Sequence, residues 1–259
     1  MTGLLEGRTA LIVGVLNKRS IAAAIANAFA AAGGRLALTY QNERTQRDVA
    51  RVADALPGDV PLFPLDVTDD DQCDAAVHGA SEALGGVDVL VHAVAFAAAS
   101  DLEGRFADTS REGFRVAHEV SAYSLVALAR RVEPIMLARG GGSIMTLTYL
   151  GAERAVPGYN VMGVAKASLE ASVRYLAWDL GAGGIRVNAI SAGPVRTAAA
   201  RGIPGFQSMA DAVTERTPLR REIDAADVAG AALYLASDLA TNVTGETLHV
   251  DAGYHAMGL

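Results

Sequence analysis

The chain has 259 residues, of which 51% are hydrophobic and 20% charged, and this balance excludes an intrinsically disordered protein. A formal net charge of −7, with no segment rich in lysine or arginine, argues against nucleic-acid binding. A single cysteine, Cys73, excludes an internal disulfide framework and a cysteine metal cluster, and the five scattered histidines lack metalloenzyme spacing.

Short apolar runs alternate along the chain with longer, alanine-rich amphipathic runs. They predict strands over residues 9–15, 35–40, 61–67, 87–96, 143–150, 185–191 and 246–251. Between them, helices are predicted near residues 20–32, 43–56, 69–84, 112–138, 159–181 and 224–237. Strands that alternate with helices form right-handed βαβ units around a parallel sheet. We therefore predict one doubly wound, Rossmann-like α/β domain over residues 1–259, with about seven parallel strands and helices on both faces.

Residues 192–223 interrupt this alternation. They form a connection of about thirty residues, rich in glycine, proline and small side chains, between a strand and the next helix. A connection of that length in a compact domain is usually functional, and often a lid that carries short helices. We predict a substrate-binding lid at about residues 194–220; the alternative is a surface loop with no role in function.

The turn after the first predicted strand reads GVLNKRSIAAAIANAF over residues 14–29. A glycine between a strand and a helix marks the place where a dinucleotide pyrophosphate meets the free N–H groups of the helix. Gly14 fits that role, but the next glycine is Gly33, so the usual G-x-G-x-x-G is absent. A plain strand–helix turn fits about equally well. Ser20 is a natural N-cap whose hydroxyl can also reach a phosphate.

The second predicted strand ends in TYQNE, over residues 39–43. An NAD site often has an acid at this point, whereas an NADP site has a base for the extra phosphate. Gln41 and Asn42 can bind hydroxyls but carry no charge, which favours NADH, although Arg44 and Arg47 leave NADPH open. Asp66, after the third strand, can accept from an adenine amino group; the alternative is that it caps the next helix.

Residues 149–168 read YLGAERAVPGYNVMGVAKAS and hold two of the seven tyrosines. A tyrosine phenol, with a pKa near 10 in water, can stabilise an anionic oxygen if a nearby cation lowers that pKa. Tyr159 and Lys166 are seven residues apart, about 20° short of two helical turns, so both project from one helix face. Tyr149 ends a strand at the edge where ligands bind in such folds. The alternative is that both tyrosines only pack.

These residues resemble the short-chain dehydrogenase/reductase superfamily, whose usual signature is Tyr-x3-Lys. The residue four before Lys166 is Met162, so that signature is absent. The sequence instead resembles the enoyl-acyl-carrier-protein reductase branch, which has Tyr-x6-Lys and another tyrosine ten residues earlier. The resemblance covers essentially the whole chain. Its other motifs, in order, are Gly14-x5-Ser20-Ile21-Ala22, TYQN (39–42), REGFRVAHEVSAYS (111–124), RVNAISAGPVRT (186–197) and HVDAGY (249–254).

The resemblance implies hydride transfer from NADH to C3 of a trans-2-enoyl thioester on acyl carrier protein, a step of fatty acid elongation. It implies that Tyr159 binds the thioester carbonyl, that Lys166 holds the nicotinamide ribose, and that Tyr149 lines the acyl site. Substrate would also touch Ala97, and residues 195–215 would close over the acyl chain. No metal is implied, and the long helices 112–138 and 159–181 resemble those that build homotetramers. The implied cofactor-binding residues are Gly14, Ser20, Ile21, Gln41, Asp66, Val67, Val94, Lys166, Val195, Arg196, Thr197, Ala198 and Ala199.

Four features depart from the usual pattern of that branch. Ala95 stands where relatives carry a glycine beside the nicotinamide, and its methyl group is expected to weaken flat aromatic inhibitors that stack there. Ala24 replaces a helix glycine, and Gly158 replaces an asparagine. The lid segment IPGFQSM (203–209) lacks the bases suited to an acidic carrier protein. Four arginines are placed to compensate: Arg201, Arg216, Arg220 and Arg221.

Two other functions stay open from the sequence. A divergent dinucleotide-binding paralogue, with weak activity or a preference for CoA esters, fits the altered lid. A ketone or alcohol dehydrogenase of the same superfamily is disfavoured by Met162. The N-terminus does not read as a signal peptide, and no uncharged apolar run reaches the roughly 18 residues of a membrane helix. We therefore expect a cytoplasmic protein without a membrane partner.

Overall fold

The computed structural model describes residues 3–197 and 206–258, with only the backbone for residues 206–209. One parallel sheet of seven strands has the order β3-β2-β1-β4-β5-β6-β7. This architecture confirms the predicted doubly wound α/β fold. The strands are β1 (Thr9–Val13), β2 (Arg35–Tyr40), β3 (Leu62–Pro64), β4 (Val89–His92), β5 (Gly142–Thr148), β6 (Ile185–Ala192) and β7 (Thr247–Val250).

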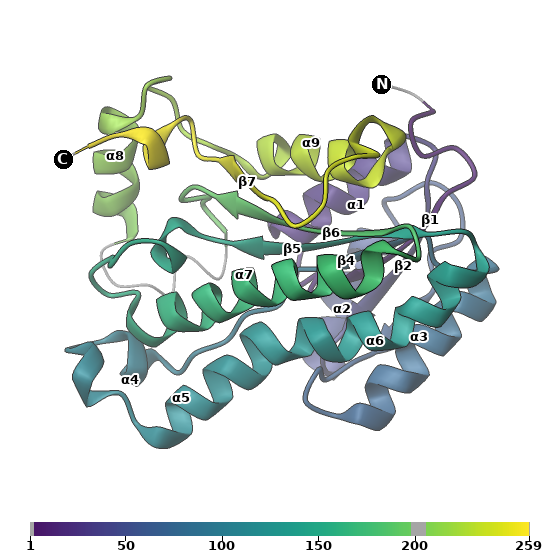
Figure 1. The fold of residues 1–259 in the computed structure, drawn as a ribbon, viewed down its shortest axis with the longest axis horizontal. Coiled ribbons are helices and arrows are strands. Elements are labelled where there is room, and N and C mark those ends of the chain that lie inside the picture. Colours follow the sequence, from purple (N-terminus) through teal and green to yellow (C-terminus); the bar gives the residue numbers. More distant parts are fainter. Residues whose placement is uncertain (1–2, 198–205, 259) are drawn as a thin grey trace.

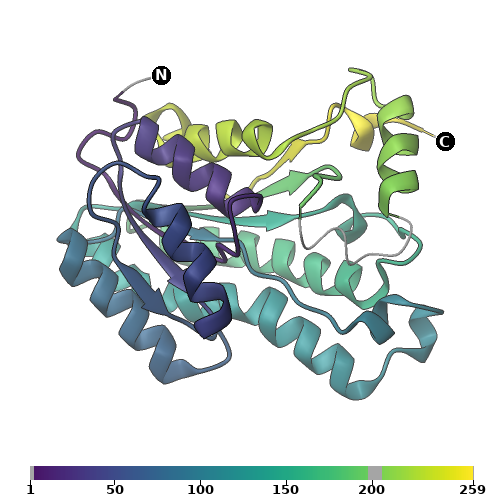
Figure 2. The same ribbon diagram turned by 180° about the vertical axis from the view of Figure 1, so that it is seen from behind.

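Helices cover both faces of the sheet (Figures 1 and 2). One face packs against α1 (Ile21–Ala31), α2 (Glu43–Ala53) and α9 (Ala225–Ala236). The other packs against α3 (Asp70–Leu84), α6 (Ser124–Ala138) and α7 (Asn160–Gly181). Since strand side chains alternate, Ile12 enters the first core and Val13 the second.

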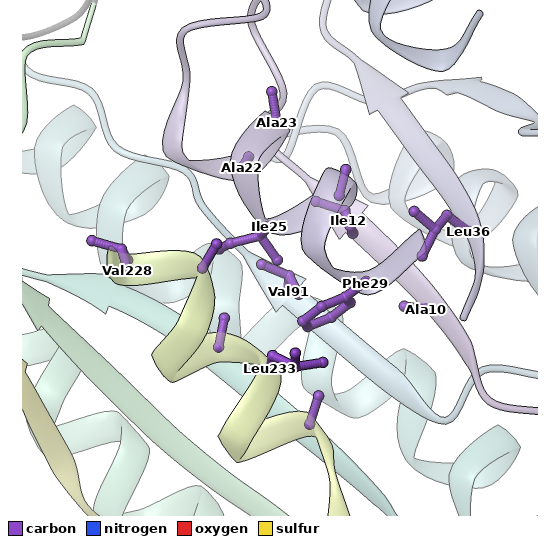
Figure 3. Packing of buried hydrophobic residues seen from close by; sticks show 14 of the residues in the cluster. Ala10, Ile12, Ala22, Ala23, Ile25, Phe29, Leu36, Val91, Val228 and Leu233 are labelled. Carbon is purple, nitrogen blue, oxygen red and sulfur yellow. The ribbon is translucent and has the colours of Figure 1, made fainter. Parts of the chain in front are cut away.

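The first core lies where α1 crosses α9. Figure 3 shows Ile25 and Phe29 of α1 facing α9, with Phe29 next to Leu233, and Ile12 of the sheet close to both α1 side chains. Burial of a side chain such as Phe29 contributes about 1.5–3 kcal/mol. This packing holds the beginning of α1 at the end of β1, which is where a dinucleotide-binding fold needs it.

Most of the long helices begin at a polar side chain that accepts a hydrogen bond from the first turn. These caps are typical of helix starts and satisfy N–H groups that have no partner inside the helix. They are Ser20, Asn42, Asp69, Ser110 and Asp224.

The structure corrects several predicted boundaries. The predicted helix 112–138 is α5 (Arg111–His118), a π-helical turn at Glu119–Tyr123, and α6. The predicted strand 87–96 ends at His92, because the following residues leave the sheet to line cavities at its edge. The segment 192–223 carries α8 (Phe206–Arg216), and a further short helix, α4 (Ala99–Leu102), was not predicted. No helix in the described part of the chain is long and apolar enough to span a membrane.

All strands end at the same edge of the sheet, where α4, α8 and the C-terminal segment also lie (Figure 1). The chain order reverses between β1 and β4, which leave the centre of the sheet in opposite directions. Ligands of open α/β sheets bind in the crevice outside such a switch point. The fold therefore locates the expected site next to Gly14 and Ala93, at the ends of these two strands.

Candidate active site

Two adjoining cavities open at the carboxyl edge of the sheet. The first, of about 400 Å³, lies over the ends of β1, β2 and β4. The second, of about 410 Å³, lies over the ends of β5 and β6 and the start of α7. Ala95 and Phe96 line both cavities, so an elongated molecule can extend from one into the other.

Five residues predicted to bind the cofactor line the first cavity: Gly14, Gln41, Asp66, Val67 and Val94. Gly14 has φ +100°, and a Cβ atom there would lie 2.2 Å from the carbonyl oxygen of Ala93. The glycine is thus required by the neighbouring backbone, whether or not a phosphate binds. The sequence argument, which considered only the phosphate, missed this cause.

The residues around the start of α1 divide between capping and cavity lining. The hydroxyl of Ser20 donates to the Asn17 carbonyl oxygen at 2.8 Å and accepts from Ala23 N at 3.2 Å. Ser20 is therefore an N-cap, as predicted, and its proton is engaged within the turn. Ile21, the first residue of the helix, lines the second cavity.

At the end of β2, only one of the two predicted polar residues lines the cavity. Gln41 does so, whereas the side chain of Asn42 caps α2 by accepting from Thr45 N at 3.1 Å. Arg44 and Arg47 lie on α2 and do not contribute to the lining.

Asp66 does not cap α3, which was its alternative role. Its Oδ1 accepts from Thr68 N at 3.0 Å and from the Thr68 hydroxyl at 2.8 Å, and Asp69 is the cap. The side chain instead shapes the turn at the rim of the first cavity. Such a position leaves carboxylate lone pairs available to a ligand.

The two tyrosines of the sequence motif meet in the second cavity. The rings of Tyr149 and Tyr159 contact edge to face, with centroids 5.0 Å apart and planes at 73°. Burial raises the pKa of Tyr149 to about 12 and that of Tyr159 above its ordinary range. Burial is the largest cause at Tyr159, and Tyr149 and Glu170 add to it, so no cation of the described residues lowers the pKa as the sequence argument would require. Both phenols are consequently neutral hydrogen-bond donors.

Lys166 lines neither cavity as the structure stands and has only 5% of its surface exposed. Its Nζ donates to the carbonyl oxygen of Leu147 at 2.7 Å. Burial lowers the pKa of Lys166 to about 8, and Glu170 opposes that shift. A charged ammonium has three N–H groups, and the Leu147 carbonyl is its one acceptor among the described residues. The remaining donors suit the hydroxyls of a nicotinamide ribose, so this residue fits the expected cofactor.

The segment after β6 contributes in part. Val195 and Thr197 line the second cavity, while the Arg196 guanidinium pairs with Asp211 of α8 and with Glu222. Ala198, Ala199, Arg201 and residues 203–205 lie outside the described residues, and so do the side chains of 206–209. On the opposite side Ala97 lines the cavity, as predicted for a residue that touches substrate.

Gly158, next to Tyr159, has φ +75° and open space where a Cβ atom would stand. Glycine and asparagine are the residues that adopt this left-handed conformation most readily. The departure from asparagine thus preserves the backbone and removes only a side chain from the cavity wall.

Several residues that shape the site were missed from the sequence. Leu102, Val156 and Met162 add apolar surface to the second cavity. Thr148 and Glu170 form a buried hydrogen bond behind it. A glutamate four residues after Lys166, in a helix that is otherwise mostly apolar there, was a usable signal for that pair.

His92, at the end of β4, is a further buried support. Its Nδ1 and Nε2 lie 2.8 Å from the hydroxyls of Thr146 and Ser124. Burial lowers the pKa of His92 to about 3, so the imidazole is neutral at physiological pH. The Ser121 hydroxyl, from the π-helical turn, accepts from Phe96 N at 2.9 Å and so fixes one of the two residues that line both cavities.

Known proteins resemble this chain over nearly its whole length. The family described as Enoyl-(Acyl carrier protein) reductase matches residues 14–255. The NADH-dependent enoyl-acyl-carrier-protein reductase of Bacillus cereus is 51% identical over 256 residues, which are 98% of this chain and 99% of that protein. The chain belongs to the enoyl-acyl-carrier-protein reductase family.

Solved structures of the family share the fold. The Bacillus cereus reductase in complex with NADP+ and indole naphthyridinone has a TM-score of 0.97 at 51% identity, with all of both chains covered. The Anaplasma phagocytophilum reductase in complex with NAD has a TM-score of 0.95 at 48% identity, with 100% of this chain and 98% of that one covered. Over the described ranges, no group of three or more metal-ligating side chains gathers that could hold a metal ion.

Proposed function

We propose that this chain reduces the trans-2 double bond of enoyl thioesters carried on acyl carrier protein, with NADH as reductant, in fatty acid elongation. The observation that carries this proposal is the paired Tyr149 and Tyr159 in an apolar cavity that joins the dinucleotide cavity, with the buried Lys166 on α7. The enoyl thioester that accepts the hydride carries a long acyl chain, and this chain needs an apolar cavity to bind in. Met162, which stands where a ketone or alcohol dehydrogenase has tyrosine, adds to that apolar wall.

Each of the three residues has a distinct role in this reaction. NADH supplies a hydride, which adds to C3 of the thioester, and C2 then takes a proton from solvent. Tyr159 donates a hydrogen bond to the thioester oxygen and stabilises the enolate that forms there. Tyr149 packs against Tyr159 and orients the acyl thioester, and Lys166 holds the nicotinamide ribose and supplies positive potential.

Steady-state turnover with NADH and a medium-chain trans-2-enoyl thioester tests this function. We expect Tyr159→Phe to lower kcat by about 100-fold, the usual effect of losing one donor to an oxyanion. We expect Lys166→Met to abolish turnover. Absence of turnover in the wild type while NADH still binds would instead favour a paralogue that has lost the chemistry.

We also infer a lid over residues 194–220 that closes on the acyl chain. Pro194, Val195 and Thr197 line the second cavity, and the Arg196 ion pairs connect this strand exit to α8. The exposed Arg216, Arg220 and Arg221 follow in the same segment and suit an acidic carrier protein. A comparison of KM for carrier-protein esters and CoA esters tests this lid. A lower KM for the carrier-protein esters indicates a lid that recognises the carrier, and equal KM values indicate one that does not.

We infer a homotetramer in the cytoplasm as the working form. Trp178 and Tyr175 on α7 are 84% and 72% exposed, and Val164 precedes them on the same helix. A patch of this kind is characteristic of a protein–protein interface. The lone cysteine, Cys73, is free and buried, which suits a reducing compartment.

A further inference from the structure

A buried acid lies behind the active site without lining either cavity. Glu170 is 8% exposed, and its Oε1 accepts from the Thr148 hydroxyl at 2.7 Å. Lys166 precedes it by four residues on α7, so the two charged side chains are neighbours on one helix face. Charged residues are rarely buried unless they are paired, and these two lie one helical turn apart.

The two side chains hold consecutive residues at the end of β5. Lys166 Nζ donates to the Leu147 carbonyl oxygen, and Glu170 accepts from Thr148, which also lines the second cavity. Tyr149 is the next residue along the chain. Lys166 and Glu170 therefore jointly fix the end of β5, which Tyr149 directly follows.

The electrostatic surroundings give the acid a second effect. Glu170 raises the pKa of Lys166 against burial. Two further titratable groups face this part of α7, the imidazole of His92 and the phenol of Tyr159, and burial keeps both neutral. Burial raises the pKa of Glu170 itself, and the hydrogen bond from Thr148 opposes that rise. Glu153 also raises it, whereas His249 and Arg174 lower it.

We propose that Glu170 is a positioning residue for the reductase reaction: through Thr148 it fixes the end of β5, and from one helical turn away it places a carboxylate beside the buried Lys166. This inference rests on the proposed function for its kinetic consequence alone. The charge state of Lys166 can be measured without substrate.

The composition of the chain makes that measurement simple. Lys166 and the exposed Lys18 are its only lysines, so protein labelled with 13C-lysine gives two side-chain signals. Lys166→Met assigns them, and Lys18 serves as an internal reference. We expect Glu170→Gln, which keeps an oxygen for Thr148 but removes the charge, to lower the Lys166 titration midpoint by about one pH unit or more. Asp179→Asn, which removes an exposed acid from the same helix, should leave it unchanged.

The pH dependence of kcat/KM gives the kinetic counterpart. Because Lys166 must be charged, the alkaline limb in Glu170→Gln should move to lower pH, so the variant loses about tenfold more activity at pH 9 than at pH 6. Thr148→Val should give a smaller shift in the same direction, and Thr148→Ser should restore the wild-type profile. These variants also keep the test decisive if Glu170→Gln fails to fold.

An unchanged Lys166 midpoint in both Glu170→Gln and Thr148→Val would overturn the inference, as would a uniform loss of activity at every pH. A wild type without turnover would refute the proposed function instead, and the lysine titration would still decide the role of Glu170.

Discussion

Ala95 lies where the two cavities of the active site meet, and it lines both of them. It is exposed and follows the end of β4, in the part of the chain that Ser121 fixes through Phe96. A methyl group here occupies space at the boundary between cofactor and substrate. A bound molecule that crosses this boundary must therefore fit around one more carbon atom than it would if residue 95 were glycine.

We predict that Ala95→Gly will strengthen binding of flat aromatic inhibitors that stack on the nicotinamide. One methyl group that fills or obstructs a pocket changes affinity by about 10- to 200-fold, and we expect about tenfold. The measurement is the inhibition constant with saturating cofactor. The KM for NADH is the control, and equal inhibition of the two proteins would contradict the prediction.

The individual residues show what a sequence can and cannot reveal about a site. Tyr149, Tyr159 and Lys166 were found because motif spacing places them on one helix and the adjacent strand end. Glu170 and His92 were missed as support because their partners come from other segments, which only the fold brings near. The rise in the pKa of Tyr159 could not be predicted, because burial at a cavity wall depends on segments that are distant in sequence.

Between elements, an ion pair between the buried Asp88 and the partly exposed Arg139 connects β1, β4 and α6. Asp88, just before β4, accepts from Thr9 N and Oγ1 at 2.8 and 2.9 Å. Arg139, which ends α6, donates through Nε at 2.5 Å and Nη2 at 2.9 Å. Burial alone would raise the pKa of Asp88, but Arg139 and Thr9 hold it below its ordinary value. The folded state therefore binds a proton at Asp88 less readily than the unfolded chain.

We predict that Asp88→Asn will lower the free energy of unfolding at pH 7 by about 2 kcal/mol, because it removes the charged acceptor of the hydrogen bonds from Thr9 and Arg139. The carboxylate contributes fully above its unfolded pKa, near 3.9, and this contribution is lost as pH falls through the lower folded value. The difference between the proteins should hence shrink below pH 4. Urea denaturation at several pH values measures it. A constant difference down to pH 2 would exclude the charge as its cause.

Strands and long helices were predictable because their apolar periods are strong, and all seven strands occur near their predicted positions. The π-helical turn at Glu119–Tyr123 was not, since its composition continues the helical pattern on both sides. Helix α4 was missed because four residues are too few for a periodic signal. The π-helical turn and α4 were missed because one is a local change of helix geometry and the other is very short. Neither changes the order of the strands, so the predicted topology was unaffected.

For the whole molecule, we predict that Trp178→Glu will convert the proposed tetramer to smaller species. A charge at this exposed position of α7 would have to be buried without a partner if copies associate through that helix. Light scattering gives the particle mass. Arg51→Glu, on α2 across the sheet, is the matched control and should leave the mass unchanged. A wild type that is already monomeric would contradict the proposed assembly.

The sheet order also governs how the protein forms during synthesis. Once β1 to β3 have left the ribosome, each later strand joins the same growing edge in the order of translation: β4, β5, β6 and then β7. A nascent chain that stops before Thr247 leaves β6, whose residues are almost all buried in the finished protein, as an open edge. Open apolar edges pair with other chains. We therefore expect β7 to protect the nascent chain from aggregation by covering the β6 edge, although α7 is made long before it.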